Sequence, residues 1–386
     1  MGFEKVCAYI DSLEATYGVP GVDVIVMKDH EVVFRHQAGH RDHDKTVPVD
    51  GTELYDIYSA TKVITMTAVM QLVEKGILDL EDDVTKYLPA FAGARVFDNY
   101  EFKPFPAPMP QREDPTRPVV GPIKLWHLMS MTAGLTYDMG HPLLQEAAKN
   151  GVPTVQAMDA IAKMPLLFDP GQHYSYSLGH DVMAAVVEVA SGERFADYLD
   201  NHIFKPLGIT RMTMHPTEEE KAQLAYQWMC DFQTGEVKPA PQGNIYRLSD
   251  NYDSGGAGLT ADVESYCKVM DALACGGVGL TGERILSEES IRILSTARLN
   301  EKQLEEFGRG PMGYSYALGV RTLIHKQIAR SAIGEFGWDG AAGAFSLADP
   351  ENHVSLYYAQ QVLGMVKSYF EIHPTLRDLV YEALEG

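Results

Sequence analysis

The sequence predicts an α/β fold of the α+β kind: an antiparallel sheet flanked by helices, built from both chain ends, with a mostly helical domain inserted between them. Residues 22–27 and 32–34 are rich in β-branched side chains and enclose a short polar turn, which is typical of a hairpin. Residues 314–359 alternate in the same way, whereas the middle of the chain shows helical periodicity. Strands at both ends of a helical middle favour one sheet made from two distant segments.

A chain of 386 residues can bury a large core, either as two domains or as one large one. From the positions of the β-rich segments we expect an α/β domain made of residues 1–75 and 250–386. Residues 76–249 would form the mostly helical domain, and the active site would lie between the two.

The expected elements follow in order along the chain. A first helix covers residues 3–17, and a central apolar helix leads from Ser59 to Gly76. Residues 90–122 contain many prolines and predict a long ordered loop. Further helical patterns occur at 123–135, 154–164, 180–191, 195–203, 262–274 and 362–385, and β-like patterns at 314–323, 327–333, 344–347 and 354–359. Residues 224–228 and 236–239 flank a polar turn and predict a second hairpin or a lid-like excursion.

Composition restricts the class of partner. The formal net charge of −21 disfavours binding to nucleic acid and to anionic membranes, so we expect neither. The first six residues show no signal-peptide pattern, and no apolar run is long enough to cross a membrane. The four cysteines form no C-x-x-C pair and are expected to be free thiols. We therefore expect a cytoplasmic protein, whose oligomeric state the sequence leaves open.

Ser59 and Lys62 stand three residues apart, so on a helix they share one face. A serine hydroxyl is a weak nucleophile until a base removes its proton, and a lysine in a desolvated site can be that base. The residues that follow, as far as Gly76, are apolar around nearly the whole helix, which indicates burial. Ser59 is therefore predicted at the N-terminal end of a central helix, where the helix dipole favours developing negative charge.

A second Ser-x-x-Lys pair, Ser265 and Lys268, shows that the spacing alone is a weak signal. There the apolar stripe leaves Ser265 and Lys268 on the polar side, which predicts a solvated helix face. The buried context of Ser59 is what favours catalysis.

Three other patterns have more ordinary explanations. Gly277–Gly282 matches G-x-G-x-x-G but follows a helix rather than a strand, so dinucleotide binding is not expected. Ser249-Asp250-Asn251 matches a motif of class A β-lactamases, but no Lys-Thr-Gly follows it. A cluster of histidines and aspartates near the first hairpin could hold a metal, although surface histidines are commoner: His30, His36, His40, Asp42, His43 and Asp44. The absence of G-x-S-x-G argues against an α/β-hydrolase.

Two later segments carry groups that could take part in acyl transfer. Tyrosines in a turn such as Tyr174–Leu178 usually serve packing, yet a phenol beside a lysine could share the base role. Gly337–Gly343 is rich in glycine, and the N–H groups of such a strand could bind an oxyanion. A bulged core strand is the commoner explanation for this pattern.

In their order along the chain these motifs resemble the serine β-lactamase-like superfamily, and within it the class C β-lactamase relatives known as family VIII carboxylesterases. The resemblance covers roughly residues 15–365 and rests on Ser59-Ala60-Thr61-Lys62, Leu125 to Leu135, Pro170 to Leu178, Ser254 to Leu259 and Gly337-Trp338-Asp339-Gly340. It implies that Ser59 is the nucleophile, Lys62 its base partner and Tyr176 the catalytic tyrosine. It also implies an oxyanion hole made by the backbone N–H groups of Ser59 and Ala341.

The chain departs from the β-lactamase pattern at two places. Leu178 stands where β-lactamases carry Asn, and Trp338-Asp339-Gly340 stands where they carry Lys-Thr-Gly. Both departures remove polar groups that hold a β-lactam, and both are similar to the forms found in the esterases. We therefore assign Leu178, Trp338, Asp339 and Gly340 to substrate binding.

The leading prediction is a serine carboxylesterase that cleaves short-chain esters through an acyl-enzyme on Ser59. It would take a small-molecule ester as its partner and use no metal or cofactor. A β-lactamase, D-amino-acid peptidase or amidase of the same superfamily is the first alternative. A catalytically silent relative that binds ligands is the second.

Overall fold

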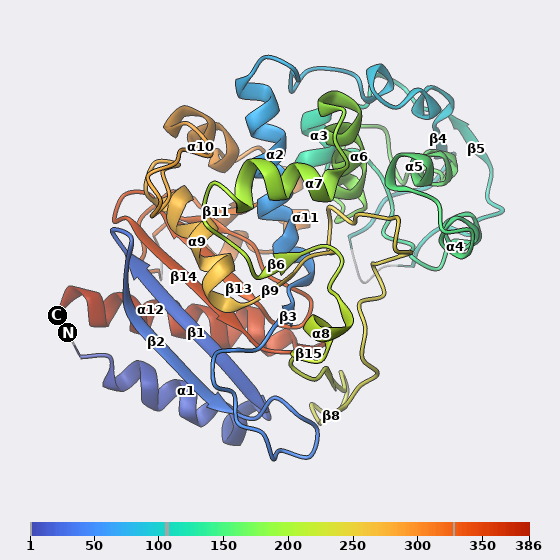
Figure 1. Ribbon diagram of the computed structural model, residues 1–386. Helices are drawn as coiled ribbons and strands as arrows, with labels where there is room; N and C mark the ends of the chain where they lie inside the picture. Colours follow the sequence, from blue (N-terminus) through green and yellow to red (C-terminus); the bar gives the residue numbers. More distant parts are fainter. Residues whose placement is uncertain (1, 105–107, 327–328) are drawn as a thin grey trace.

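The computed structural model describes residues 2–104, 108–326 and 329–386. Its centre is a seven-stranded antiparallel sheet that takes strands from both ends of the chain, as predicted (Figure 1). Val24 of the first strand lies opposite Tyr358 of a strand near the C-terminus, and this pairing joins the two segments. In sheet order the strands are β10 (Tyr314–Tyr316), β11 (Arg321–Leu323), β12 (Phe336–Gly337), β13 (Phe345–Asp349), β14 (Val354–Ala359), β1 (Gly21–Lys28) and β2 (Glu31–Gly39).

Both faces of this sheet are covered, which explains the four consecutive apolar residues Val24 to Met27 in β1. Because neighbouring residues of a strand point to opposite faces, Val24 and Ile25 join two different cores. Val24 packs in the core that includes residues of α1 (Glu4–Tyr17) and α12 (His373–Glu385), the helices nearest the two chain ends. Ile25 packs in the larger core on the other face, together with α9 (Val263–Ala274).

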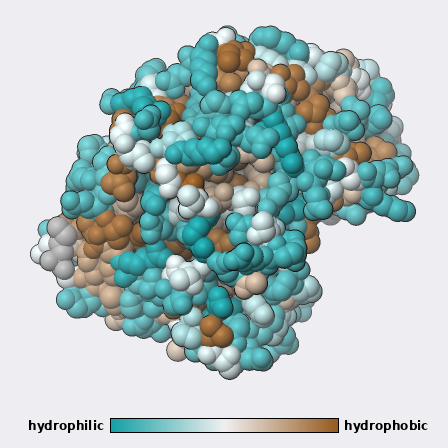
Figure 2. Space-filling model, in the orientation of Figure 1, coloured by the Kyte–Doolittle hydropathy of each residue, from teal (hydrophilic) through white to brown (hydrophobic). Residues whose placement is uncertain are grey.

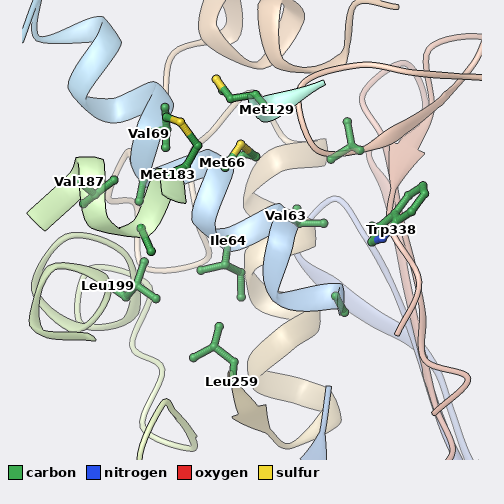
Figure 3. Packing of buried hydrophobic residues seen from close by; sticks show 14 of the residues in the cluster. Val63, Ile64, Met66, Val69, Met129, Met183, Val187, Leu199, Leu259 and Trp338 are labelled. Atoms are coloured by element: carbon green, nitrogen blue, oxygen red, sulfur yellow. The ribbon is translucent and has the colours of Figure 1, made fainter. Parts of the chain in front are cut away.

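The central helix α2 (Thr61–Glu74) runs through this larger core, and its residues from Thr61 to Leu72 are all buried. Fully burying a large apolar side chain contributes about 1.5–3 kcal/mol, so such a helix is held by contacts on every side. Figure 3 shows α2 side chains among those of other elements: Val63, Ile64, Met66 and Val69 with Met129, Met183, Val187, Leu199, Leu259 and Trp338. The predicted buried central helix is confirmed.

Residues 76–249 contain more helix than strand, and the helices α3 to α7 lie above and to the right of the sheet in Figure 1. Their helices are α3 (Leu125–Met129), α4 (Pro142–Lys149), α5 (Thr154–Lys163), α6 (Gly179–Ser191), α7 (Phe195–Leu199) and α8 (Glu218–Lys221), with tighter or wider turns at Val84–Lys86, Pro89–Gly93 and Asp200–Phe204. Two more helices follow α9, namely α10 (Glu288–Ser295) and α11 (Glu301–Phe307). The exact boundaries between two domains stay a prediction.

Three smaller sheets connect distant parts of the chain. Their strands are β3 (Tyr55–Asp56), β9 (Thr260–Ala261) and β6 (Met212–Thr213); β15 (Val362–Leu363), β7 (Trp228–Cys230) and β8 (Val237–Pro239); and β4 (Arg95–Phe97) and β5 (Thr116–Pro118). Strands β7 and β8 form a hairpin, as expected from the sequence, but its first strand is Trp228–Cys230 rather than residues 224–228. Strands β4 and β5 lie within the predicted loop 90–122, so its described residues are partly paired.

The helix predicted over residues 123–135 is shorter than expected, since α3 ends at Met129. Met131 and Gly134 have φ angles of +60° and +87°, in the left-handed region. A right-handed helix cannot continue through such residues. The chain turns there instead of extending the helix.

Two predictions near the C-terminus are also corrected. Residues 329–333 form no strand, because the N–H groups of Arg330 and Ala332 donate to the carboxylates of Asp378 and Asp349 rather than to a neighbouring strand. Positions 327 and 328 of that predicted strand lie outside the described residues. The helix predicted over 362–385 begins later, with a π-turn at Ser368–Ile372 that leads into α12, because its first two residues form β15.

Within the described residues, no helix combines the length and the apolar character needed to cross a membrane. The face shown in Figure 2 is largely hydrophilic, with scattered apolar patches.

Candidate active site

Ser59 lies in a 3-10 turn, Tyr58–Ala60, that leads directly into α2. The preceding Tyr58 has a φ of +46°, which is unusual for a bulky residue and costs energy unless the surroundings hold it. Its ring is buried and its hydroxyl hydrogen-bonds Gln227. The turn presents Ser59 to a cavity of about 1220 Å³.

Lys62 is fully buried and lies one turn along the helix from Ser59. Its Nζ is 3.2 Å from the Ser59 Oγ and donates to the carbonyl oxygen of Gly256 at 2.7 Å. The same Nζ also lies 4.7 Å from the centroid of the Tyr176 ring. Lys62 is therefore within hydrogen-bond reach of the serine hydroxyl, as a general base must be.

Asp181, in the first turn of α6, carries a buried carboxylate that is close enough to Lys62 for the two groups to interact electrostatically. It accepts hydrogen bonds from the hydroxyls of Tyr252 and Ser254 at 2.9 and 2.7 Å. Burial raises the pKa of Asp181, while the Ser254 hydrogen bond and the charge of Lys62 act in the opposite direction. A Cβ on Gly256 would lie 2.5 Å from the Asp181 Oδ2, so any other residue at this position would require the carboxylate to shift. The sequence analysis did not identify Asp181. The only sequence feature that could have indicated it is an acidic residue in the first turn of an otherwise apolar helix.

Tyr176 lines the same cavity as Ser59. Its hydroxyl accepts a hydrogen bond from the Trp338 Nε1 at 3.1 Å, and the two rings stack with centroids 5.9 Å apart. The indole N–H thus helps to fix the Tyr176 hydroxyl at the wall of the cavity that Ser59 also lines.

The segment that follows Trp338 approaches the Ser59 turn closely. A Cβ on Gly340 would lie 2.4 Å from the carbonyl oxygen of Ile57, so no other residue fits there without a shift. Ala341 comes next and lines the cavity together with Ser59. The oxyanion hole assigned to the N–H groups of Ser59 and Ala341 stays a prediction.

Asp339, at the cavity wall, forms ion pairs with two arginines, of which Arg309 also lines the cavity and Arg321 is buried. Its carboxylate pairs with Arg309 at 2.6 Å and with Arg321 at 2.9 Å. Burial acts to raise the Asp339 pKa, but the charges of Arg321 and Arg309 outweigh it and lower the pKa to about 2. The Arg309 guanidinium also lies over the Trp338 ring, 5.2 Å from its centroid. No sequence motif pointed to Arg309.

Leu178 is not brought to the cavity surface. It is 2% exposed, precedes α6 and packs in the large core. We expect it to shape the site through packing rather than through contact with the substrate.

The second Ser-x-x-Lys pair is organised differently. Ser265 is buried rather than solvated as predicted, because it lies in the first turn of α9, where its N–H donates to the N-cap carboxylate of Asp262. Lys268 pairs with Glu264 at 2.8 Å.

Three of the histidines that were predicted to cluster each have a different partner. His36 pairs with Asp11, His43 with the backbone of Gln227 and His30 with Asp271.

A protein-family model described as Beta-lactamase matches residues 6–378. The chain is 26% identical over 353 residues to a Mycobacterium tuberculosis protein named Rv1367c, covering 88% of this chain and 85% of that one. It is 28% identical over 278 residues to Esterase EstB of Burkholderia gladioli, covering 66% and 65%. Among solved structures it is similar to EstCE1, described as a hydrolase with promiscuous acyltransferase activity, with a TM-score of 0.79, 24% identity and 98% of each chain covered.

Proposed function

Because the chain belongs to the beta-lactamase family, whose fold carries serine hydrolases and acyltransferases, we propose that it is a carboxylesterase that cleaves short-chain esters through an acyl-enzyme on Ser59. The observation that carries the proposal is the contact of 3.2 Å between the Lys62 Nζ and the Ser59 Oγ. Ser59 opens onto a cavity large enough for an ester and both of its substituents, while Lys62 lies buried behind the cavity wall.

In the proposed reaction the Ser59 Oγ attacks the ester carbonyl after its proton passes to the pair of Lys62 and Tyr176. The N–H groups of Ser59 and Ala341 hold the tetrahedral oxyanion. Tyr176 returns a proton to the alkoxide as the bond between the carbonyl carbon and the alcohol oxygen breaks. Water then enters, loses a proton to the same pair and attacks the acyl carbonyl, and the pair returns the proton to the Ser59 Oγ as its bond to the acyl group breaks.

The cavity wall supports a neutral ester rather than a β-lactam. Trp338 supplies an aromatic surface where β-lactamases carry a lysine. Of the arginines that line the cavity, Arg309 is already paired with Asp339 and Arg112 with Asp138. A carboxylate bound beside either arginine would have to compete with an existing ion pair.

We expect nitrophenyl butyrate to be hydrolysed with a kcat/KM about one hundred to ten thousand times that of a cephalosporin. A β-lactam brings a carboxylate and a side-chain amide, and leaving each without its partner costs roughly 1–3 kcal/mol. The measurement is kcat/KM for both substrates on one preparation, with Ser59→Ala as the blank. A cephalosporin value equal to or above the butyrate value would reject the esterase proposal in favour of a β-lactamase.

Acyl transfer to an alcohol is a second candidate for the same site. The solved relative EstCE1 is described as having promiscuous acyltransferase activity, and the cavity of about 1220 Å³ leaves room for an alcohol beside the acyl group. Adding an aliphatic alcohol to the butyrate assay distinguishes the two outcomes. A new butyrate ester identifies transfer, and free butyric acid alone identifies hydrolysis.

Trp338→Phe is expected to lower kcat roughly tenfold to a hundredfold while KM changes less, since a hydrogen bond to a charged oxygen contributes about 1.5–3 kcal/mol. Phenylalanine keeps an aromatic ring against Tyr176 but removes the indole N–H that donates to its hydroxyl. The measurement is steady-state kinetics on nitrophenyl butyrate, with Trp126→Phe as the control at a partly buried tryptophan outside the cavity lining. An unchanged kcat in Trp338→Phe would show that this hydrogen bond does not support the reaction.

A further inference from the structure

Three side chains of different chemistry converge where the tip of the β1–β2 hairpin meets the end of α9. They are the imidazole of His30, the carboxylate of Asp271 and the thiol of Cys275. The His30 Nδ1 lies 2.6 Å from one Asp271 oxygen, and the Cys275 Sγ lies 3.9 Å from the other. All three ligand atoms lie within 4.8 Å of one another.

The backbone of α9 and that of the β1–β2 turn together bring these three side chains close to one another. Asp271 and Cys275 are four residues apart at the end of α9, so they lie on one face of the helix. His30 is in the left-handed region, with φ at +69°, at the turn between β1 and β2. The turn therefore carries the imidazole over the helix end.

The burial of the group suits a bound cation. The Asp271 side chain is 1% exposed, and Cys275 is half-buried, whereas the His30 side chain is 31% exposed. A buried carboxylate is costly without a positive partner, and a neutral imidazole supplies a hydrogen bond but no charge. The open side at His30 gives an ion from solvent a path to the carboxylate.

We propose that His30, Asp271 and Cys275 bind a divalent thiophilic cation of the zinc class. Nitrogen, oxygen and sulfur are the ligand set that Zn²⁺ accepts, and around a tetrahedral ion such atoms lie roughly 3.5 Å apart. The atoms here need shifts of only about 1 Å to reach that spacing. The ion takes the place of the Cys275 thiol proton, which leaves to solvent, and a water molecule completes the four ligands.

The proposed ion would join the first hairpin to α9, two segments far apart in the sequence. It does not touch the residues around Ser59, and the esterase proposal does not depend on it. We therefore expect Zn²⁺ to raise the unfolding temperature, because a ligand that binds the folded state stabilises it. Ester hydrolysis should be the same after treatment with a chelator.

The test is titration of the chelator-treated full-length protein with Zn²⁺ by calorimetry and with Co²⁺ by absorption. We expect one ion per chain and a near-ultraviolet charge-transfer band from thiolate to Co²⁺. Cys275→Ser should remove the band and weaken Zn²⁺ binding roughly tenfold or more. His30→Gln, a change at the exposed hairpin tip, should also weaken binding while leaving ester hydrolysis intact.

Cys230→Ser is the matched control, because Cys230 is also a half-buried free cysteine but lies in β7. It should bind both ions as the unmodified protein does. The proposal is overturned if no saturable binding of one ion per chain occurs, or if Cys275→Ser keeps the band and the affinity. It is equally overturned if Cys230→Ser loses them to the same degree.

Discussion

Ser59→Ala is expected to lower kcat for nitrophenyl butyrate by about ten thousandfold or more, because it removes the atom that forms the acyl-enzyme. The residual rate would come from binding and from the N–H groups of the oxyanion hole. The fold should persist, since the change removes one oxygen from a residue that faces the cavity rather than the core. The rate is measured with a hydrolysis assay. Titration with an organophosphonate ester, which labels a reactive serine hydroxyl, measures whether that hydroxyl has been lost.

The chain supplies a matched control for this change. Ser265 belongs to the other Ser-x-x-Lys pair and is buried in the first turn of α9. Ser265→Ala should keep full activity and should still form the phosphonate adduct. An active Ser59→Ala protein, or an adduct on another residue, would show that Ser59 is not the nucleophile.

The parts of the fold that the sequence predicted well are those with a strong local pattern. The β1–β2 hairpin shows two runs of β-branched residues around a short turn. The helix α2 is apolar on every side, and only burial explains such a pattern. These signals depend on residues a few positions apart, so no distant contact is needed to interpret them.

The errors occurred where distant contacts decide the backbone. The helix predicted after Ile123 stops at Met129, because Met131 adopts a left-handed conformation that a methionine at this position does not predict. The segment at Arg330 and Ala332 alternates like a strand, yet its N–H groups are taken by carboxylates on other elements. Tertiary contacts override local preference in both cases.

In the candidate site, too, the contacts between residues close in the sequence were predicted and those between distant residues were not. Ser59 and Lys62 are three residues apart, so a helical pattern was enough to bring them together. The hydrogen bond between Trp338 and Tyr176 joins residues 162 positions apart, and no periodicity within either segment specifies it. Arg309 was missed for the same reason, because its role follows from its contact with Asp339, thirty residues later along the chain.

Lys62→Met and Tyr176→Phe are each expected to lower kcat by about a hundredfold or more, the usual range for a lost general base. Methionine keeps the length and apolar stem of a lysine that is fully buried, so the packing of α2 should survive. The Lys62 Nζ lies 3.2 Å from the Ser59 Oγ and 4.7 Å from the centre of the Tyr176 ring. If Lys62 and Tyr176 transfer the proton of Ser59 together, removing either side chain stops that transfer.

The double variant should therefore be little slower than either single one, rather than slower by the product of the two losses. The measurement is a double-mutant cycle on kcat with nitrophenyl butyrate. Lys268→Met, at the lysine of the other Ser-x-x-Lys pair, is the control and should be nearly as active as the unmodified protein. Losses that multiply in the double variant would mean that Lys62 and Tyr176 act in separate steps, and an active Lys62→Met protein would leave Ser59 without the base proposed for it.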